Sequence, residues 1–328
     1  MEKSPIRLIN VIVAISLAFA VGCQQESPDS GPAPTREKYS GTGPIRITCT
    51  TNIIKDLVRQ IGGEHVAVTA IMDGPSIDPH SYTPSPKDTN SLTAADLVVY
   101  SGLHLEGQFD EALESLKHRG IPVICVTTGL SQERPGRLIR TEDGTPDPHV
   151  WFDPELWAAC GDWLALELAD FDPAHADDYR QSAAAFRDEM ATTSERGTEM
   201  LSSVPQRRRV LVTAHDAFTY FARAFDFEVQ AVQGISTESE PGVRRINELV
   251  NLLVDRKIGA VFTEQSVSEK NIQALVAGCA AAGHDLKIGG KLYSDTAGAE
   301  GTEAETLSGA LLHNIRQMVA ALTDETTP

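Results

Sequence analysis

Short apolar runs alternate with helical patterns along most of the chain, and this order limits the possible folds more than any other feature. The runs lie at residues 45–51, 65–72, 96–102, 121–129, 207–215, 227–234, 259–265 and 286–290. Apolar side chains recur at helical spacing between them, for example over residues 52–63. A repeated strand–helix order favours mainly parallel sheets covered by helices. The runs form two groups of four, so we predict two α/β lobes, at residues 45–172 and 206–324.

The segment between the two groups, residues 173–205, has the pattern of one long helix. Its apolar residues fall near one helical face, and they are Tyr179, Ala183, Phe186, Met190 and Leu201. Gly197 opposes a helix by roughly 1 kcal/mol relative to alanine. About thirty helical residues would span roughly 45 Å, so we expect a stiff helix that joins the lobes.

The N-terminus has the features of an export signal. Lys3 and Arg7 precede an apolar run that is too short for a typical membrane-spanning helix. The run ends in "AVGC", which resembles the bacterial lipoprotein box and makes Cys23 the expected lipidated residue. Ordinary cleavage nearby, or an uncleaved anchor, remains the alternative. We therefore expect a signal peptide at 1–23 and an extracytoplasmic protein held to a bacterial membrane by its lipid.

Residues 24–44 are rich in proline, glycine and serine and predict a flexible tether. The net charge of −18 argues against a nucleic-acid partner, which would require a basic face. Four further cysteines are widely scattered and form no CxxC pair. Disulfides are possible in an exported chain, but we expect these residues to act as small buried hydrophobes.

Two histidines share one local setting, because an Asp-Pro-His sequence contains both His80 and His149. His215 directly follows a predicted strand, and Asp295 follows another after a short loop. In open α/β sheets, ligands bind at the carboxyl ends of strands, so a cleft between the lobes could gather all four side chains. Three imidazoles and one carboxylate suit Zn²⁺ well and Mn²⁺ passably. We therefore predict one divalent metal site.

Other polar residues near these segments receive secondary roles. Asp147, Asp153 and Asp216 are candidate acceptors for imidazole N–H groups. Three glutamates could reach the cleft, namely Glu238, Glu240 and Glu264. We interpret them as loop residues. The remaining histidines carry no such context and are expected to be surface or structural residues, and they are His65, His104, His118, His175, His284 and His313.

Six motifs of the chain resemble those of a known family. In chain order they are "DPHSYTPSP", "SGLHLEG", "DPHVWFDPELW", "TAHDAFTYFARAF", "GISTESE" and "GGKLYSDTAG". Because these motifs occur in the family's order and at its spacing, the chain resembles the TroA-like zinc- and manganese-binding lipoproteins of bacterial ABC importers over residues 45–322. The resemblance implies two lobes, each with a parallel four-stranded sheet, bridged by one long helix. It implies that His80, His149, His215 and Asp295 bind one divalent metal ion.

The resemblance also implies partners and leaves metal selectivity open. The expected partners are an ABC permease and its ATPase, and the chain is expected to be a monomer that is not an enzyme. His215 stands where manganese-dedicated members typically have glutamate, whereas residues 131–148 lack the histidines common in zinc-dedicated members. Thr83 and Thr219 also depart from the family pattern. Two other functions remain as alternatives, a secreted zinc-dependent hydrolase, which would need an open coordination position, and a surface adhesin.

Overall fold

The computed structural model describes residues 38–141 and 143–323. The expected signal peptide, Cys23 and most of the expected tether lie outside the described residues. The last part of the tether is already packed, because the Tyr39 N–H donates to the Phe171 carbonyl at 2.7 Å and the two rings are in contact. An aromatic side chain within reach of an apolar surface is the physical reason that this end of the segment is ordered.

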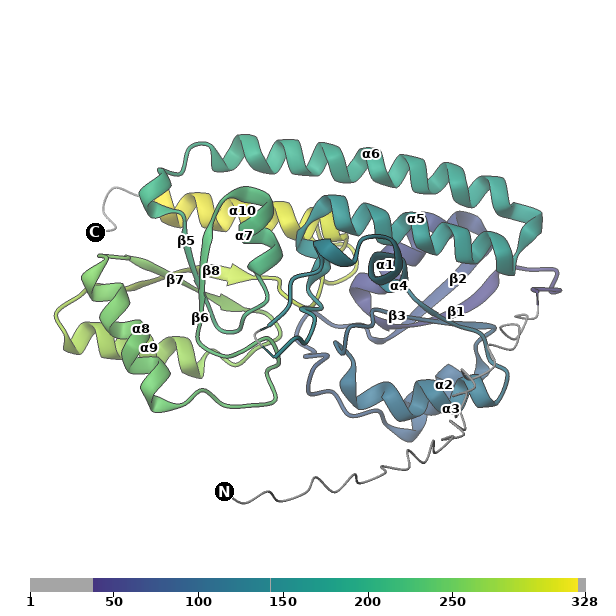
Figure 1. The fold of residues 1–328 in the computed structure, drawn as a ribbon, viewed down its shortest axis with the longest axis horizontal. Helices are drawn as coiled ribbons and strands as arrows, with labels where there is room; N and C mark the ends of the chain where they lie inside the picture. The colour runs from purple at the N-terminus through teal and green to yellow at the C-terminus, as the bar shows by residue number, and fades with distance from the viewer. Residues whose placement is uncertain (1–37, 142, 324–328) are drawn as a thin grey trace, which may run out of the picture. The chain divides into compact units, whose positions relative to one another are not determined.

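The first lobe contains one four-stranded parallel sheet with the strand order β2-β1-β3-β4. Its strands are β1 (Ile45–Thr51), β2 (Val66–Met72), β3 (Leu97–Tyr100) and β4 (Val123–Cys125). Its helices are α1 (Asn52–Gly62), α2 (Pro86–Ala94), α3 (Asp110–His118), α4 (Thr128–Glu133) and α5 (Pro154–Phe171). Figure 1 shows α2 and α3 on one side of this sheet and α1 and α5 on the other. This is the parallel α/β lobe that the sequence predicts.

The second lobe differs in detail from the predicted single four-stranded sheet. Its strands are β5 (Val210–Thr213), β6 (Glu228–Ala231), β7 (Ala260–Glu264) and β8 (Lys287–Leu292). They form two parallel pairs, β5-β6 and β7-β8, although β5 lies beside β7. Just beyond β5, the backbone N–H of His215 donates to the side chain of Glu264 and not to a backbone carbonyl. The helices of this lobe are α7 (Thr219–Phe225), α8 (Val243–Asp255), α9 (Lys270–Ala281) and α10 (Leu307–Thr323).

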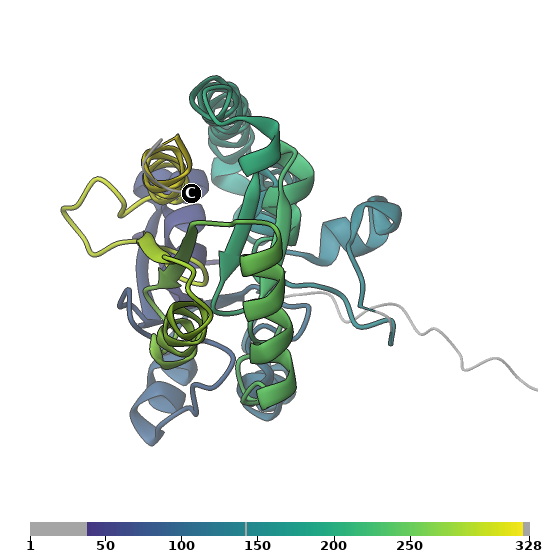
Figure 2. The ribbon, with the colours of Figure 1, turned by 90° about the vertical axis from the view of Figure 1, so that its left-hand side faces the viewer.

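The predicted connecting helix is present as α6 (Ala176–Leu201), 26 residues long. The apolar face expected from the sequence is buried, and it packs on α5, α1 and α10 (Figures 1 and 2). Gly197 sits where this packing is closest, because a Cβ there would lie 2.8 Å from Ile315 Cδ1 and 3.1 Å from Phe225 Cε1. The residue that lowers helix propensity therefore allows the second lobe to approach the helix.

Short 3-10 turns complete the described chain, at Gly63–His65, Gly107–Phe109, Pro135–Arg137, Val150–Phe152, Pro173–His175 and Gln206–Arg208. The cysteines of the described part are free thiols, of which Cys125 is half-buried and the others are buried, as expected. Over residues 38–141 and 143–323, no helix is both long enough and apolar enough to cross a membrane.

Candidate metal centre

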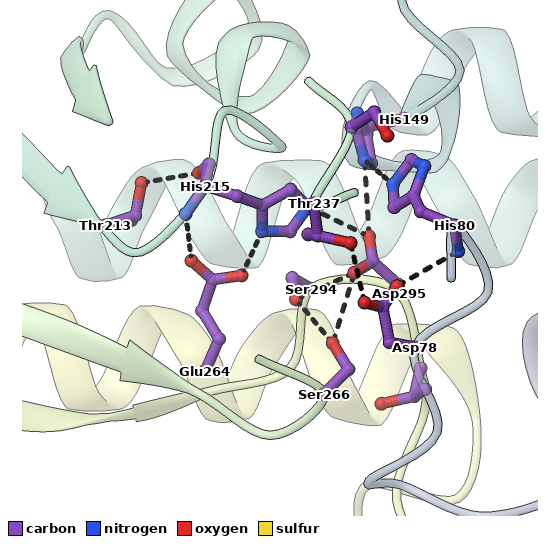
Figure 3. Close-up of polar contacts among 12 residues, drawn as sticks. Asp78, His80, His149, Thr213, His215, Thr237, Glu264, Ser266, Ser294 and Asp295 are labelled. Atoms are coloured by element: carbon purple, nitrogen blue, oxygen red, sulfur yellow. Dashed lines mark hydrogen bonds and ion pairs between the residues drawn. The ribbon is translucent and has the colours of Figure 1, made fainter. Parts of the chain in front are cut away.

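Four side chains from distant parts of the sequence converge at the carboxyl ends of the strands (Figure 3). His80 comes from the loop after β2, and His149 immediately precedes a 3-10 turn ahead of α5. His215 follows β5, and Asp295 follows β8. One ligand atom from each of the four lies within 4.8 Å of the other three. Three strand-end loops and the segment ahead of α5 thus bring together the three histidines and the aspartate predicted from the sequence.

The separations within this group match the coordination shell of a small cation. His80 Nε2 lies 3.3 Å from His149 Nε2, and Asp295 Oδ1 lies 3.2 Å from His149 Nε2 and 3.3 Å from His215 Nε2. Ligand atoms bound at 2.0–2.1 Å in a tetrahedron stand roughly 3.3 Å apart. These three separations are therefore close to those around a bound Zn²⁺ ion, and the remaining pairs lie within 4.8 Å.

The group is buried and two of its atoms lack hydrogen-bond partners. His149, His215 and Asp295 are fully buried, and His80 is 4% exposed. Within the described residues, His215 Nε2 and Asp295 Oδ1 make no hydrogen bond despite their proximity. Unpaired buried polar atoms are costly, and a cation between them would satisfy both.

Asp147 fixes the orientation of the His149 ring. Its Oδ1 lies 2.7 Å from His149 Nδ1 and also accepts the His149 backbone N–H at 2.9 Å. A proton held on Nδ1 leaves the lone pair of Nε2 facing the group and available to bind a metal ion. Asp147 was one of the three aspartates selected for this task from the sequence.

Glu264 does the same for His215, a role that the sequence analysis did not give it. It is fully buried at the end of β7, so its interpretation as a loop residue is corrected. Glu264 Oε2 lies 2.6 Å from His215 Nδ1, and its Oε1 accepts the His215 backbone N–H at 2.9 Å. A carboxylate that ends the buried run "AVFTE" on a parallel strand was the signal available in the sequence.

The other two candidate acceptors require correction, because their carboxylates bind elsewhere. Asp153 caps α5 by accepting the N–H of Glu155, and it also accepts a hydrogen bond from Arg223 at 2.9 Å. Asp216 accepts a hydrogen bond from the Thr219 hydroxyl. Helix caps and a nearby arginine compete for a short carboxylate, and sequence proximity to a histidine could not reveal this.

His80 is held through its backbone. Asp78 Oδ1 accepts the His80 N–H at 3.0 Å, and Asp78 Oδ2 accepts the hydroxyl of Thr237 from the second lobe at 2.6 Å (Figure 3). The loop that carries His80 is therefore tied to both lobes.

The pKa values within the group reflect burial opposed by neighbouring charges. Burial lowers the pKa of His149, but Asp147 and Asp295 outweigh it and raise that pKa to about 9. Burial likewise opposes protonation of His215, whose pKa is raised well above its usual value by Asp295 and Glu264. Burial raises the pKa of Asp295, but the two adjacent imidazoles hold it well below the usual range. The pKa of His80 falls to about 4, mainly through burial.

The remaining candidates lie apart from the group. Glu238 accepts a hydrogen bond from Gln108 on the surface, and Glu240 lies 3.5 Å from the Asn271 amide. His104 is exposed, and His65 stacks on His175 with ring centroids 3.9 Å apart. These residues match the surface and structural roles expected for them.

Comparison with known proteins identifies the family of this chain. The family model for zinc-uptake complex component A, periplasmic, matches residues 47–321. A manganese-binding lipoprotein, MntA of Bacillus subtilis, is 41% identical over 280 residues, covering 85% of this chain and 90% of the relative. The zinc-binding protein TroA of Treponema pallidum is 38% identical, with similar coverage.

Solved structures agree with this assignment. The periplasmic zinc-binding protein TroA from Treponema pallidum superposes with a TM-score of 0.81 at 37% identity, and the match covers 85% of this chain and 99% of that one. The two α/β lobes and their connecting helix are thus the architecture of a solved relative. The chain belongs to the family of zinc-uptake complex component A proteins.

Proposed function

We propose that this protein is the extracytoplasmic solute-binding component of an ABC importer, and that it captures one divalent transition metal ion between its lobes. His80, His149, His215 and Asp295 are the proposed ligands. The observation that carries the proposal is the spacing of their donor atoms, together with two buried atoms that make no hydrogen bond within the described residues. The relatives named as manganese- and zinc-binding proteins support the same function.

The donor set favours zinc on intrinsic affinity and leaves manganese possible. Imidazole ligands bind Zn²⁺ more tightly than Mn²⁺ in the general order of divalent metals. Selection in the cell would then depend on metal supply and on coordination geometry. We therefore propose zinc or manganese as the transported ion.

The protein is proposed to act by binding and delivery, without catalysis. A hydrolytic zinc usually has three protein ligands and an open position for water, whereas four protein side chains converge here. No observation supports the hydrolase or the adhesin alternative. Delivery to a permease with its ATPase, attachment through a lipid on Cys23 and a monomeric state complete the proposal.

Titration of the purified, metal-stripped protein with Zn²⁺ and with Mn²⁺ tests this function. We expect one ion per chain, and we expect His149→Ala to lower the affinity by at least a hundred-fold. The matched control is His104→Ala, which removes an exposed imidazole outside the group. Equal affinities for the two variants would contradict the ligand assignment.

A further inference from the structure

The loop that carries Asp295 belongs to the second lobe but is hydrogen-bonded to the first lobe on both sides of the carboxylate. Before it, the carbonyl of Ser294 accepts the indole N–H of Trp151 at 2.9 Å. After it, the hydroxyl of Thr296 donates to the carbonyl of Pro75 at 2.8 Å. These groups are buried or half-buried, so water offers them little replacement.

The strongest of these attachments is made by Asn52, the first residue of α1. Its Nδ2 donates to the Ala297 carbonyl at 2.9 Å, and its Oδ1 accepts the Ala297 N–H at 3.0 Å. Asn52 is 7% exposed and Ala297 is fully buried. A side-chain amide that matches both backbone groups of one residue fixes the position and the direction of the chain there.

From the second lobe, Asn314 on α10 accepts the N–H of Tyr293 at 2.8 Å and donates to its carbonyl at 2.7 Å, two residues before Asp295, and a serine orients the carboxylate itself. The hydroxyl of Ser266 donates to Asp295 Oδ2 at 3.1 Å, and Asp295 Oδ1 is left to face the three imidazoles (Figure 3). From Ser294 to Ala297, the first lobe holds the Ser294 carbonyl through Trp151, the Thr296 hydroxyl through Pro75 and the Ala297 backbone through Asn52. Separation of the lobes at this loop must therefore break these hydrogen bonds.

We infer that Asn52 is a positioning residue that sets how long the metal stays bound, by clamping the Asp295 loop to the first lobe. The inference rests on the proposed function. Loss of the clamp removes two buried hydrogen bonds that hold the Asp295 loop beside the imidazoles, and it leaves the encounter of metal with the imidazoles unchanged. The effect therefore falls on the dissociation rate and not on the association rate.

The test measures Zn²⁺ release into excess chelating dye by stopped flow, far below the unfolding temperature. We expect Asn52→Ala to accelerate release on the order of ten-fold, with far-UV circular dichroism and the association rate unchanged. Thr296→Val, which removes only the donor to Pro75, should accelerate release in the same direction. If Asn52→Ala fails to fold, the release rate of Thr296→Val tests the inference instead.

Two controls separate positioning from general stability. Ile61→Val trims a buried side chain near the other end of helix α1 and should release metal at the wild-type rate. Asn90→Ala removes an exposed amide from α2 and should also release metal at the wild-type rate. Wild-type release rates for Asn52→Ala and Thr296→Val, or equally fast release by Ile61→Val, would overturn the inference.

Asp295→Ala distinguishes this failure from failure of the proposed function. If wild-type protein binds Zn²⁺ and Asp295→Ala does not, the site is correct and only the role of Asn52 is in question. If neither protein binds Zn²⁺ or Mn²⁺, the proposed function is wrong and the inference falls with it.

Discussion

Glu264 and His215 are joined twice, since one carboxylate oxygen meets the ring Nδ1 at 2.6 Å and the other accepts the backbone N–H at 2.9 Å. The two bonds fix the ring plane as well as its tautomer. Because Glu264 lies on β7 and His215 follows β5, the pair also links two strands that share no backbone ladder. A residue outside the proposed ligand set therefore determines where a ligand atom points.

Replacement of Glu264 should weaken metal binding without removing a ligand. We expect Glu264→Gln to lower Zn²⁺ affinity by about 10- to 100-fold, because the ring loses its charged acceptor. A competition titration against a chelator measures the change. Glu238→Gln, at an exposed glutamate, is the control and should bind as wild type.

Substitution of Asp147 should lower the metal affinity, whereas substitution of Asp153 should lower the stability of the fold. Asp147→Asn removes the charged acceptor of His149 Nδ1, so Zn²⁺ affinity should again fall by about 10- to 100-fold. Asp153→Ala removes a helix cap and an arginine contact, so it should lower the free energy of unfolding by about 1 kcal/mol. Denaturant unfolding and metal titration of both variants check the prediction. Similar affinities for the two would contradict it.

Metal should stabilise the fold, because the proposed site exists only in the folded chain. Free Zn²⁺ at about a hundred times its dissociation constant should add about 2.7 kcal/mol to the free energy of unfolding. Chelation should reverse this gain, and Asp295→Ala should show almost none of it. A metal-induced shift of the unfolding midpoint that survives in Asp295→Ala would place the ion elsewhere.

The buried carboxyl group of Asp56 should make the free energy of unfolding depend on pH. It accepts the N–H of Leu307, the first residue of α10, at 2.8 Å. Burial, only partly offset by this bond and one from Gln60, raises its pKa to about 6. The folded state then binds more protons than the unfolded state between about pH 4 and 6, so this contribution to stability is present at low pH and is lost as the pH rises through 6.

Asp56→Asn keeps an acceptor for Leu307 and removes the titration. Its free energy of unfolding relative to wild type should therefore rise by up to about 3 kcal/mol between pH 4 and pH 7, at 1.36 kcal/mol per pKa unit. Asp88→Asn is the matched control of opposite sign. The pKa of Asp88 is lowered, by hydrogen bonds from Ser85 and Tyr82 that outweigh its burial. A pH-independent difference for Asp56→Asn would refute the prediction.

Gly197 should tolerate no large side chain. Gly197→Leu would place atoms into Ile315 and Phe225, so we expect a loss of about 1–3 kcal/mol despite the better helix propensity of leucine. Thr198→Leu, one residue further on the exposed face of α6, is the control. Chemical denaturation of both proteins provides the measurement.

Sequence patterns predicted the elements well, because each strand is a short apolar run and α6 has a clear apolar face. The predicted strand at 45–51 is β1, residue for residue. The pairing of strands was less accessible, since the split between β5-β6 and β7-β8 depends on long-range geometry. The four residues of the candidate metal centre were predicted from the repeated Asp-Pro-His sequence and from positions after strands, aided by the family resemblance.

The supporting residues were harder to select, because a carboxylate has many possible partners. Asp147 lies two residues from His149, so their contact is local and could be anticipated. Glu264 reaches His215 across 49 residues of sequence, and only the fold places β7 beside β5. Asp153 stands near His149 in sequence, but a helix N-terminus uses its carboxylate instead.

The unbroken helix α6 limits how this protein can change shape. With 26 residues it extends about 39 Å, and bending it would strain a continuous series of backbone hydrogen bonds. A wide hinge motion of the two lobes would therefore cost more free energy than a local shift of the few residues beyond each strand, although that shift must break the hydrogen bonds of the Asp295 loop. We therefore expect metal release to proceed by displacement of those loops, with α6 kept intact.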